Sequence, residues 1–440
     1  MRWSGRFLMM AALTALAIAA LAGWSEAALA QAEEAAQESE PAEKAWPPRN
    51  DGLVIPILFG PEGIGGGLGY YFHDLGGKQG RDLLLHDVFT NTAYKQLLGD
   101  FTEPDFLLPG GTLNLRGYYL HRTGLHFFGI GNDTDIEDGA YYGAEIYSGR
   151  LSYEWTIARG LGLGGGAEYH RTALHDGKLG DPNFDPNYPE LDRPLSEVYP
   201  ALVRSDDFHF REMTHNWFAT VFHDDRDHPV FPTRGGYQRA TITRVDESLG
   251  ADWNYWLYTA EAAVFVPAPN DHNVAGLYAR WDRLDGRELP FWELPALGHG
   301  RLNLADYTDD FGLRGYWENR FQDKNRALAS FEFRHRTRAE WWPEDFLNFP
   351  KPKEKEPRFK FMAGQKTLGE TAHEFVLNSS TLVFLDAGNT WGDHESLDAV
   401  RLTPGVGAVL YFDTGMAMRV TVGFSDELTF YQVFADWQAF

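Results

Sequence analysis

Apolar and polar side chains alternate in segments of about ten residues from Leu53 to the C-terminus, and clusters of Gly, Asp, Asn and Pro separate these segments. Alternation with a period of two places successive side chains on opposite faces of a β-strand. Repeated segments of this length with turn residues between them are typical of transmembrane β-barrels. In residues 255–266 one face is apolar and is expected to meet lipid; it carries Trp256, Tyr258, Ala260, Ala262, Val264 and Val266.

The length of the chain supports closure of these strands into one barrel. About 390 residues follow residue 50, and roughly 24 residues for each strand with its connection give about sixteen strands, an even number as in bacterial outer-membrane barrels. We therefore predict an all-β fold, a transmembrane antiparallel β-barrel of about 16 strands, over residues 51–440. The clearest segments are 68–72, 112–120, 146–153, 162–169, 217–223, 238–245, 255–266, 274–281, 328–333, 381–386, 405–411 and 418–424.

Residues 1–30 have the three parts of a secretory signal peptide. Arg2 and Arg6 form a basic region, an apolar stretch follows, and Ala28-Leu29-Ala30 is a small-residue cleavage site. We expect cleavage before Gln31. A single membrane anchor is the alternative, but an apolar run of about 17 residues followed directly by a cleavage site is short and wrongly flanked for a span.

The exported part of the chain begins with a stretch that has little to bury. Residues 31–50 consist mainly of Ala, Glu and Pro and are predicted to form a flexible periplasmic leader. No run of 18 or more uncharged apolar residues occurs after residue 30. The chain therefore either stays soluble or enters a membrane as strands, because hydrocarbon admits only helices and closed barrels. The alternating pattern favours the strands.

Two stretches interrupt the strand pattern, and the C-terminus completes it. Residues 176–208 are rich in Pro, Asp and Asn, which is typical of a long surface loop. Residues 337–378 are predicted to be a periplasmic insertion with a short helical turn at 344–348. The chain ends on Phe440, and a terminal Phe that closes an aromatic last strand is what outer-membrane barrels present at the periplasmic rim.

Composition restricts the classes of function. The chain has 39 basic and 63 acidic residues, a net charge of −24, and this charge repels phosphate backbones, so we do not expect nucleic acid as a partner. It has no cysteine, which excludes disulfides. With 46 Gly, 14 Trp, 20 Tyr and 31 Phe, it suits many short strands with tight turns better than a helical globule.

Residues 311–326 read FGLRGYWENRFQDKNR and carry the most informative motif. Leu313-Arg314-Gly315-Tyr316 resembles the V/I-R-G-F/Y loop motif of the BamA/TamA-type outer-membrane assembly proteins, also called bacterial surface antigens. The second motif of that family, F-x-D-x-G, is matched by Phe384, Asp386 and Gly388. The resemblance implies that Arg314 lies on a plug loop that follows the eleventh strand, folds back into the lumen and pairs with Asp386 on the thirteenth strand.

Weaker similarities extend the resemblance over about residues 51–440. The R-D-x-x-x-x-P-T-x-G turn of the family is matched by Arg226, Asp227, Pro232, Thr233 and Gly235, and it implies a periplasmic turn. The stretch Phe127-Phe128-Gly129-Ile130-Gly131-Asn132 and the terminal Phe440 also fit. Larger members carry periplasmic POTRA domains that receive client proteins, and the leader of about 20 residues has no room for one.

By resemblance, we expect a role in outer-membrane protein insertion or assembly, or in polypeptide translocation. That role needs no cofactor and no catalytic residue, and its expected partners are outer-membrane lipids together with client outer-membrane proteins or periplasmic assembly factors. A gated pore or substrate-specific channel without assembly activity is the alternative. A structural outer-membrane protein or an enzyme on the barrel rim is a third interpretation.

Other candidate chemistry is weaker. His223, Asp224, Asp225, Asp227 and His228 could bind zinc or manganese, but a solvated polar turn explains them better. The chain has no G-x-S-x-G motif and no thiol, so we expect no enzyme.

Glycine-rich and aromatic stretches have structural explanations. The stretch at 64–69 reads IGGGLG but lacks a P-loop Lys, so it indicates close packing or curvature of a barrel strand. The aromatic residues are expected to form interfacial girdles rather than a sugar-binding platform; they are Tyr70, Tyr71, Phe72, Tyr141, Tyr142, Trp341, Trp342 and Trp437.

Overall fold

The structure is a computed structural model. It describes residues 52–54, 57–60, 63–91, 94–158, 160–177, 193–203, 209–227, 232–269, 273–298, 312–336, 359–360, 365–366, 379–393, 400–411, 417–427 and 429–436. The predicted signal peptide and leader, Phe440, and almost all of the predicted insertion at 337–378 lie outside the described residues.

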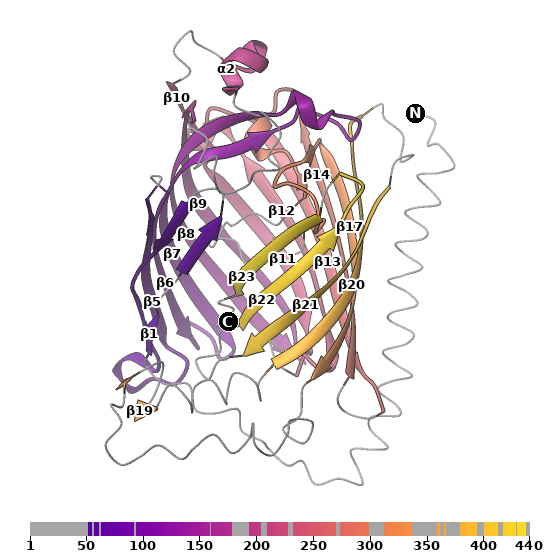
Figure 1. The fold of residues 1–440 in the computed structure, drawn as a ribbon. Helices are drawn as coiled ribbons and strands as arrows, with labels where there is room; N and C mark the ends of the chain where they lie inside the picture. Colours follow the sequence, from indigo (N-terminus) through magenta and orange to yellow (C-terminus); the bar gives the residue numbers. More distant parts are fainter. Residues whose placement is uncertain are drawn as a thin grey trace, which may run out of the picture.

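Most of the described chain is one antiparallel sheet in which each strand pairs with the next along the sequence (Figure 1). The uninterrupted strands are β5 (Asp82–Thr90), β6 (Lys95–Pro104), β7 (Gly111–Phe127), β8 (Ala140–Ala158), β9 (Leu161–Asp176), β12 (Gly235–Val245), β13 (Tyr255–Pro267), β14 (Asn273–Gly286), β17 (Asn325–Arg336), β20 (Ser379–Trp391), β21 (Arg401–Tyr411), β22 (Ala417–Phe424) and β23 (Thr429–Asp436). Two two-stranded ladders stand apart, β15 (Ala296–Leu297) with β16 (Phe321–Gln322) and β18 (Phe359–Lys360) with β19 (Gln365–Lys366).

Three further strands are broken into two pieces each. β1 (Gly52–Val54) and β2 (Ile57–Gly60) pair with β4 (Gly69–Phe72) and β3 (Gly63–Gly66), and β3 and β4 both pair with β5. β10 (His209–Met213) and β11 (Asn216–Asp224) both pair with β9. When each broken strand counts once, the sheet has sixteen strands, which confirms the predicted fold class.

The break between β3 and β4 falls in the glycine-rich stretch of the sequence. A Cβ at Gly65 would lie 2.0 Å from the carbonyl oxygen of Phe89, and one at Gly67 would lie 1.7 Å from that of Asp87. No side chain fits there, so these glycines allow two backbones to approach closely. The structure supports the packing interpretation of this stretch.

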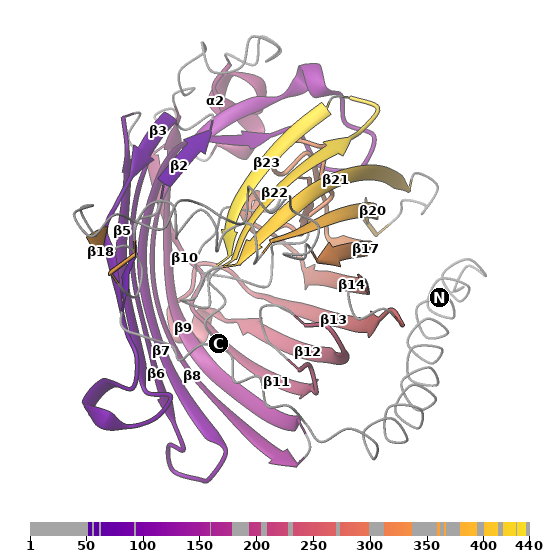
Figure 2. The same cartoon turned by 60° about the horizontal axis from the view of Figure 1, so that its bottom comes forward.

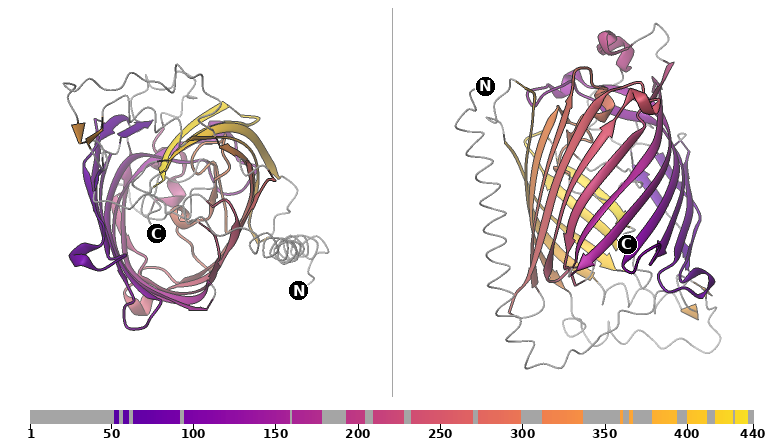
Figure 3. Two further views of the ribbon diagram at one scale, coloured as in Figure 1. Left: turned by 90° about the horizontal axis from the view of Figure 1, so that it is seen from below. Right: turned by 180° about the vertical axis from the view of Figure 1, so that it is seen from behind.

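The strands are tilted and surround a lumen, and the sheet has two free edges (Figures 2 and 3). Among the described residues, β23 pairs only with β22, and β1 and β2 pair only with β4 and β3. The first and last described strands therefore lie on either side of a break in the sheet (Figure 3, left). We call the end of the barrel that bears α2 (Leu195–Val198), at the top of Figure 1, the upper rim, and the opposite end the lower rim.

As predicted, successive side chains along a strand point alternately into the lumen and to the outer surface. On β13, Tyr255, Leu257, Thr259 and Glu261 line a cavity inside the barrel, so the alternate residues from Trp256 to Val266 face outwards. Large apolar side chains are exposed on the outer face, among them Leu85, Leu97, Leu115, Leu151, Leu163, Val221, Phe331 and Val383. Within the described ranges, no helix is long and apolar enough to cross a membrane.

An apolar cluster lies in the upper half of the barrel, and the pattern of the sequence does not predict it. We call it the apolar cap; its buried members are Leu125, Phe127, Ala140, Tyr142, Ala144, Leu174, Leu195, Val245, Ala251, Trp253, Tyr255, Leu284, Phe291 and Leu294. They come from strand ends and from the connections that hold α2, η3 (Pro200–Leu202), η4 (Glu247–Leu249) and η5 (Phe291–Glu293).

Part of the predicted aromatic girdle is wrong, because three of its residues are buried. Tyr142 is buried in the cap, where its ring packs edge-on against Phe291 at 5.3 Å. Tyr141 is also buried, and Tyr71 is buried with its hydroxyl donating to Asp82 at 2.8 Å. Tyr70, by contrast, is exposed. Neighbouring aromatic residues in a strand point to opposite faces, so only one of each pair can meet lipid.

Candidate functional site

The connection between β14 and β17 folds into the barrel. Residues 312–324 of this connection, which we call the plug loop, include twelve consecutive buried residues from Gly312 to Asp323. Six of these twelve are polar or charged: Arg314, Glu318, Asn319, Arg320, Gln322 and Asp323. Buried charges require partners. The partners of this loop therefore show how it is held in the lumen.

Arg314 and Asp386 form a bidentate ion pair at the centre of this site. The Arg314 guanidinium donates from Nε to Asp386 Oδ2 at 2.7 Å and from Nη2 to Oδ1 at 2.6 Å, and the Arg314 backbone N–H donates to Oδ2 at 3.2 Å. Asp386 lies on β20, the thirteenth strand, and is completely buried. The structure thus brings the two motif residues together, and three hydrogen bonds join loop to wall.

Other wall residues complete the environment of the Arg314 guanidinium. It donates to Glu332 Oε1 at 2.6 Å and to Ser330 Oγ at 2.9 Å, both on β17. The Phe384 ring lies under the guanidinium, with its centroid 3.5 Å from Cζ. Glu332 in turn accepts from Arg419 on β22 at 2.6 Å. One plug-loop arginine therefore links β17 and β20 directly and β22 through Glu332.

Glycines let the loop backbone lie against the barrel wall. Gly315 has φ +102°, a conformation that residues with a side chain rarely adopt. On β22, a Cβ at Gly423 would lie 2.7 Å from the carbonyl carbon of Arg314. On β20, a Cβ at Gly388 would lie 2.9 Å from a methyl carbon of Leu297, which packs with Leu313 and Tyr316 in one apolar cluster. The small residues of the two motifs thus provide the space that the loop occupies.

The far end of the plug loop is bound to the connection between the last two strands. The Tyr316 hydroxyl donates to Asp426, which lowers the pKa of that carboxyl. Arg320 donates from Nε to Glu427 at 2.8 Å and from Nη2 to the Thr134 carbonyl oxygen at 2.7 Å. The loop therefore joins the β22–β23 connection to the connection between β7 and β8.

A second buried ion pair ties the loop to β7. Arg122 donates to both carboxylate oxygens of Glu318, at 2.8 and 2.7 Å. Beyond β7, the stretch Phe127 to Asn132 also packs on the loop: the Gly131 N–H donates to the Gln322 carbonyl oxygen at 2.8 Å, and the Phe128 ring lies 5.1 Å from the Arg320 guanidinium. The glycine-rich motif noted in the sequence therefore contacts the plug loop directly.

The predicted turn motif joins β11 to β12 at the lower rim. Asp227 accepts from the Thr233 backbone N–H at 2.8 Å and also from the Thr233 hydroxyl. Gly235 has φ +90°, and a Cβ there would lie 2.3 Å from the carbonyl oxygen of Asp225. Arg334 of β17 donates to the Pro232 carbonyl oxygen at 2.7 Å.

The remaining member of this motif has a local partner as well. Arg226 donates to both carboxylate oxygens of Asp224, at 2.8 and 2.7 Å. The motif therefore builds a hydrogen-bonded turn between β11 and β12. Across the part of the chain that the structure describes, no group of three or more His, Asp or Glu is placed to hold a metal ion.

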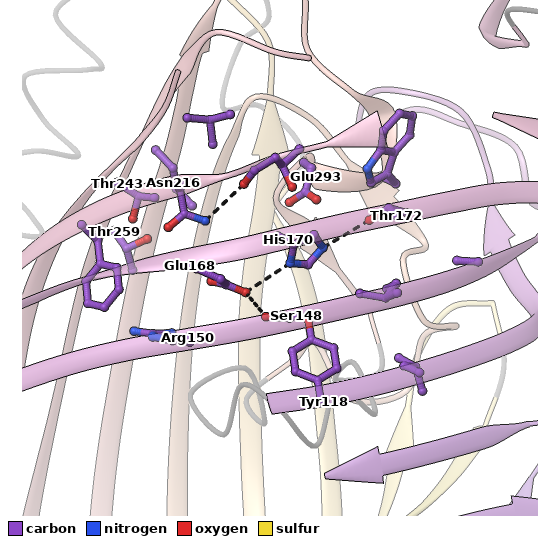
Figure 4. A pocket seen from close by; sticks show the side chains of 18 of the residues that line it. Tyr118, Ser148, Arg150, Glu168, His170, Thr172, Asn216, Thr243, Thr259 and Glu293 are labelled. Carbon is purple, nitrogen blue, oxygen red and sulfur yellow. Dashed lines mark hydrogen bonds and ion pairs between the residues drawn. The ribbon is translucent and has the colours of Figure 1, made fainter. Parts of the chain in front are cut away.

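A cavity of about 290 Å³ lies inside the barrel below the apolar cap (Figure 4). Its lining is rich in charged and polar side chains from β7 to β14, and Glu318 and Asn319 of the plug loop also border it. Within it, Glu168 accepts from Ser148 at 2.6 Å and contacts His170 Nδ1 at 3.2 Å. The polar lining is consistent with a water-filled lumen that the loop and the cap close.

Several residues of this site lie outside the sequence motifs and were not predicted. Arg122, Glu318, Arg320, Glu332 and Arg419 belong to no short motif, and their partners lie far away in the sequence. The sequence does contain one indication. Arg122, Glu332 and Arg419 are charged residues within barrel strands, on the face that alternation assigns to the lumen. That signal marks a lumen position but does not identify the partner.

These features define a class of protein: a sixteen-stranded antiparallel barrel with residues of the connection between its eleventh and twelfth strands buried inside it. No family model matches the chain. A solved structure similar to it is BamA from Haemophilus ducreyi lacking POTRA domains 1-3, with a TM-score of 0.55 and 13% identity over 88% of this chain and 70% of that one.

A second similar structure is CdiB from Escherichia coli, with a TM-score of 0.51 and 10% identity over 88% of this chain. The match spans 62% of the CdiB chain. At such identities, these two similarities establish the fold. The chain therefore has a β-barrel of the BamA and CdiB type.

Proposed function

We propose that this protein is an outer-membrane barrel of the BamA/TamA family that inserts or assembles outer-membrane proteins or translocates polypeptides. In this proposal the first and last strands form a seam at which a client strand pairs. Client outer-membrane proteins or periplasmic assembly factors are its partners, together with outer-membrane lipids. The proposal assigns no catalytic residue and no cofactor.

The observation that carries the proposal is the tether between Arg314 and Asp386. A loop inside a barrel needs a strong directional attachment, and a buried bidentate arginine–carboxylate pair supplies one. The pair occupies the two motifs that resemble those of the family, on the connection after the eleventh strand and on the thirteenth strand. The two free edges of the sheet supply the second requirement, since unpaired strand edges can accept another strand.

A gated pore is the second candidate, and the polar cavity supports it. Charged side chains such as Arg116, Arg150 and Arg239 line the lumen, as expected for a path that conducts ions. Against this function, the plug loop and the apolar cap both occupy space inside the barrel. A steady open channel would require both to move.

A conductance measurement distinguishes the assembly function from a gated pore. We would reconstitute the chain in planar bilayers and compare wild type with a deletion of residues 312–319. The assembly function predicts a nearly closed wild type that opens when the loop is removed. Large steady channels in the wild type would support the pore and contradict a closed lumen.

Locking the seam tests assembly itself. Because the chain contains no cysteine, one introduced pair forms the only disulfide. A pair that joins residues 53–60 to residues 429–436 should abolish insertion of a client barrel into liposomes and leave the conductance of the loop deletion intact. The matched control is a lock at Val422 and Tyr431, which are already paired on β22 and β23. Full client insertion by the seam-locked protein would exclude the proposed mechanism.

A further inference from the structure

Basic side chains gather on the outer face of β6 to β10, near the upper rim. Cross-strand pairing places Lys95 beside His121, and Arg211 beside Ala173. One step along the strands, Arg171 pairs with Tyr147. We call Lys95, His121, Arg171, His175 and Arg211 the outer basic cluster. Its members alternate with lumen-facing residues such as Leu120, His170 and Thr172, so they point away from the lumen.

The cluster lies just beyond the apolar band of the barrel. The outward residues of β8 from Trp155 through Tyr153 and Leu151 to Tyr147 span eight residue steps, roughly 26 Å along the strand at ~3.3 Å per step. That length, on a tilted strand, is close to the ~25 Å apolar band of outer-membrane barrels, which aromatic girdles flank. Tyr119, Tyr147 and Tyr169 form the upper girdle on these strands; Tyr147 and Tyr169 are exposed and Tyr119 is half-buried. The cluster therefore lies at the level of the lipid headgroups in the leaflet nearest the upper rim.

Within the described residues, the three cations Lys95, Arg171 and Arg211 of the cluster outnumber its acidic groups. Glu145 is the acidic residue within it, and its carboxylate accepts hydrogen bonds from the Tyr119 and Tyr147 hydroxyls at 2.8 and 3.1 Å. Arg171 Nε has no hydrogen-bond partner, and neither Lys95 nor Arg211 forms an ion pair within the described part of the chain. This is unexpected on a chain with a net charge of −24, because a random patch of its surface would be acidic.

The width of the cluster indicates what it binds. From Lys95 on β6 to Arg211 on β10 there are four strand spacings, roughly 19 Å at ~4.8 Å each. A single phosphodiester would reach only part of this surface, whereas a headgroup with two phosphates could contact cations at both ends. Arginine guanidinium and lysine ammonium groups are the usual protein ligands of such phosphates.

We propose that the outer basic cluster binds the headgroup of a membrane lipid that carries two phosphate monoesters, in the leaflet at the upper rim. The Arg171 and Arg211 guanidinium groups and the Lys95 ammonium group hold the phosphates, and the Tyr147 and Tyr169 rings contact the upper part of the acyl region. This inference uses the membrane placement of the barrel but not its role in assembly. Failure of lipid binding therefore leaves the seam experiment unaffected.

The other side of the barrel offers a matched control. Arg244 on β12 pairs with Trp256 of the outward face, over whose ring its guanidinium lies at 4.9 Å. It is therefore an outward arginine beside an upper aromatic residue, like Arg171. Its charge, however, is already paired with Asp246 at 2.9 Å. Arg244→Gln removes the same charge from a site that the proposal does not use.

The test measures binding of lipid A, whose disaccharide carries two phosphates, to the folded barrel by native mass spectrometry in detergent. Near an anionic headgroup, each cation is expected to change affinity roughly fivefold. The double variant R171Q/R211Q should therefore bind lipid A roughly 25-fold more weakly than wild type, and R244Q should bind within about twofold of wild type. Heat-modifiable migration on gels establishes that each variant is folded.

Three results would overturn the proposal. Wild-type affinity in R171Q/R211Q, or an equal loss in R244Q, would show that the cluster does not hold the lipid. Equal binding of lipid A stripped of its phosphates, or of phosphatidylglycerol, would exclude recognition of two phosphate monoesters. Complete competition by inorganic phosphate would assign the cluster to a free anion instead of a lipid.

Discussion

Gly423 of β22 lies directly beneath Arg314 of the plug loop: a Cβ at position 423 would be 2.7 Å from the carbonyl carbon of Arg314 and 2.7 Å from the backbone nitrogen of Gly315. The contact is between two backbones, so no rotamer change can relieve a larger residue. The barrel wall and the plug loop therefore contact each other through their backbones at this point, without a side chain from either. This contact and the ion pair beside it both place the loop against the barrel wall.

Gly423→Val should displace the plug loop while leaving the strand itself intact. Valine is favoured in strands, so the loss comes only from the collision with the loop backbone. We expect the variant to conduct like the deletion of residues 312–319. The control is Gly149→Val on β8, because a Cβ at Gly149 meets nothing within 4 Å. Closed channels in Gly423→Val would show that the loop is not held against β22.

Arg314→Ala should destabilise the barrel by ~3–5 kcal/mol, because it leaves the buried Asp386 carboxylate without its cation. Asp386→Ala should cost less, because Arg314 keeps its ion pair with Glu332. The double variant should cost much less than the sum of the two, since it removes both charges. Unfolding by guanidinium of the lipid-reconstituted barrel measures the three values. Additive losses would mean that the two residues act independently.

Exchanging the two charges should restore little stability. The pair alone would suggest a partial recovery, but Arg314 also donates to Glu332 at 2.6 Å. In the exchanged variant, Asp at position 314 would face Glu332, and the two like charges would repel each other. Adding Glu332→Gln to the exchange should therefore recover stability that the exchange alone does not.

Sequence reasoning could reach Arg314 and Asp386 because each lies in a short motif and the strands between them can be counted. It could not reach the pairing of Arg122 with Glu318, which are 196 residues apart and have no motif in common. Such a pair depends on where the plug loop lies inside the barrel relative to β7, which no short motif encodes.

The same limit applies to other elements of the fold. β5 and β6 were not among the clearest segments, because Asp82, His86 and Asp100 interrupt their apolar faces; all three are buried in the structure. The apolar cap was missed for a different reason. Leu195, Trp253 and Phe291 come from three separate connections that lie far apart in the sequence. They form an apolar cluster only because the folded barrel brings the three connections together.

The apolar cap should open locally when one of its large side chains is removed. Phe291 is buried against Phe127, Tyr142 and Trp292, with ring centroids 4.9 to 5.3 Å apart. Truncating such a phenylalanine typically costs ~3–5 kcal/mol, but the strands below are held by their own ladders. Phe291→Ala should therefore increase proteolysis at 246–254 and 287–295 without lowering the unfolding temperature of the barrel. Leu249→Ala, at an exposed residue of the same region, is the control.

Breaking the link between the plug loop and the last hairpin should loosen the strand that borders the seam. Arg320 donates from Nε to Glu427 at 2.8 Å, its Nη2 lies 2.6 Å from the other Glu427 oxygen in the same ion pair, and Tyr316 donates to Asp426. Both acceptors belong to the short connection from β22 to β23. Because β23 pairs with β22 alone among the described strands, this connection is the point at which the loop can hold the edge strand in place.

The variant Arg320→Ala/Tyr316→Phe should therefore raise the amide hydrogen exchange rate of residues 417–436 by roughly tenfold, as expected for the loss of about 1.4 kcal/mol of local stability. Strands β12 to β14 should exchange as in wild type. Lys324→Ala is the control, because Lys324 is in the same loop but pairs with Asp393 at an exposed site, which contributes little to stability. If the exchange rate of the last hairpin does not change, the plug loop does not control the seam. Occupation of the lumen and opening of the seam would then depend on separate parts of the molecule.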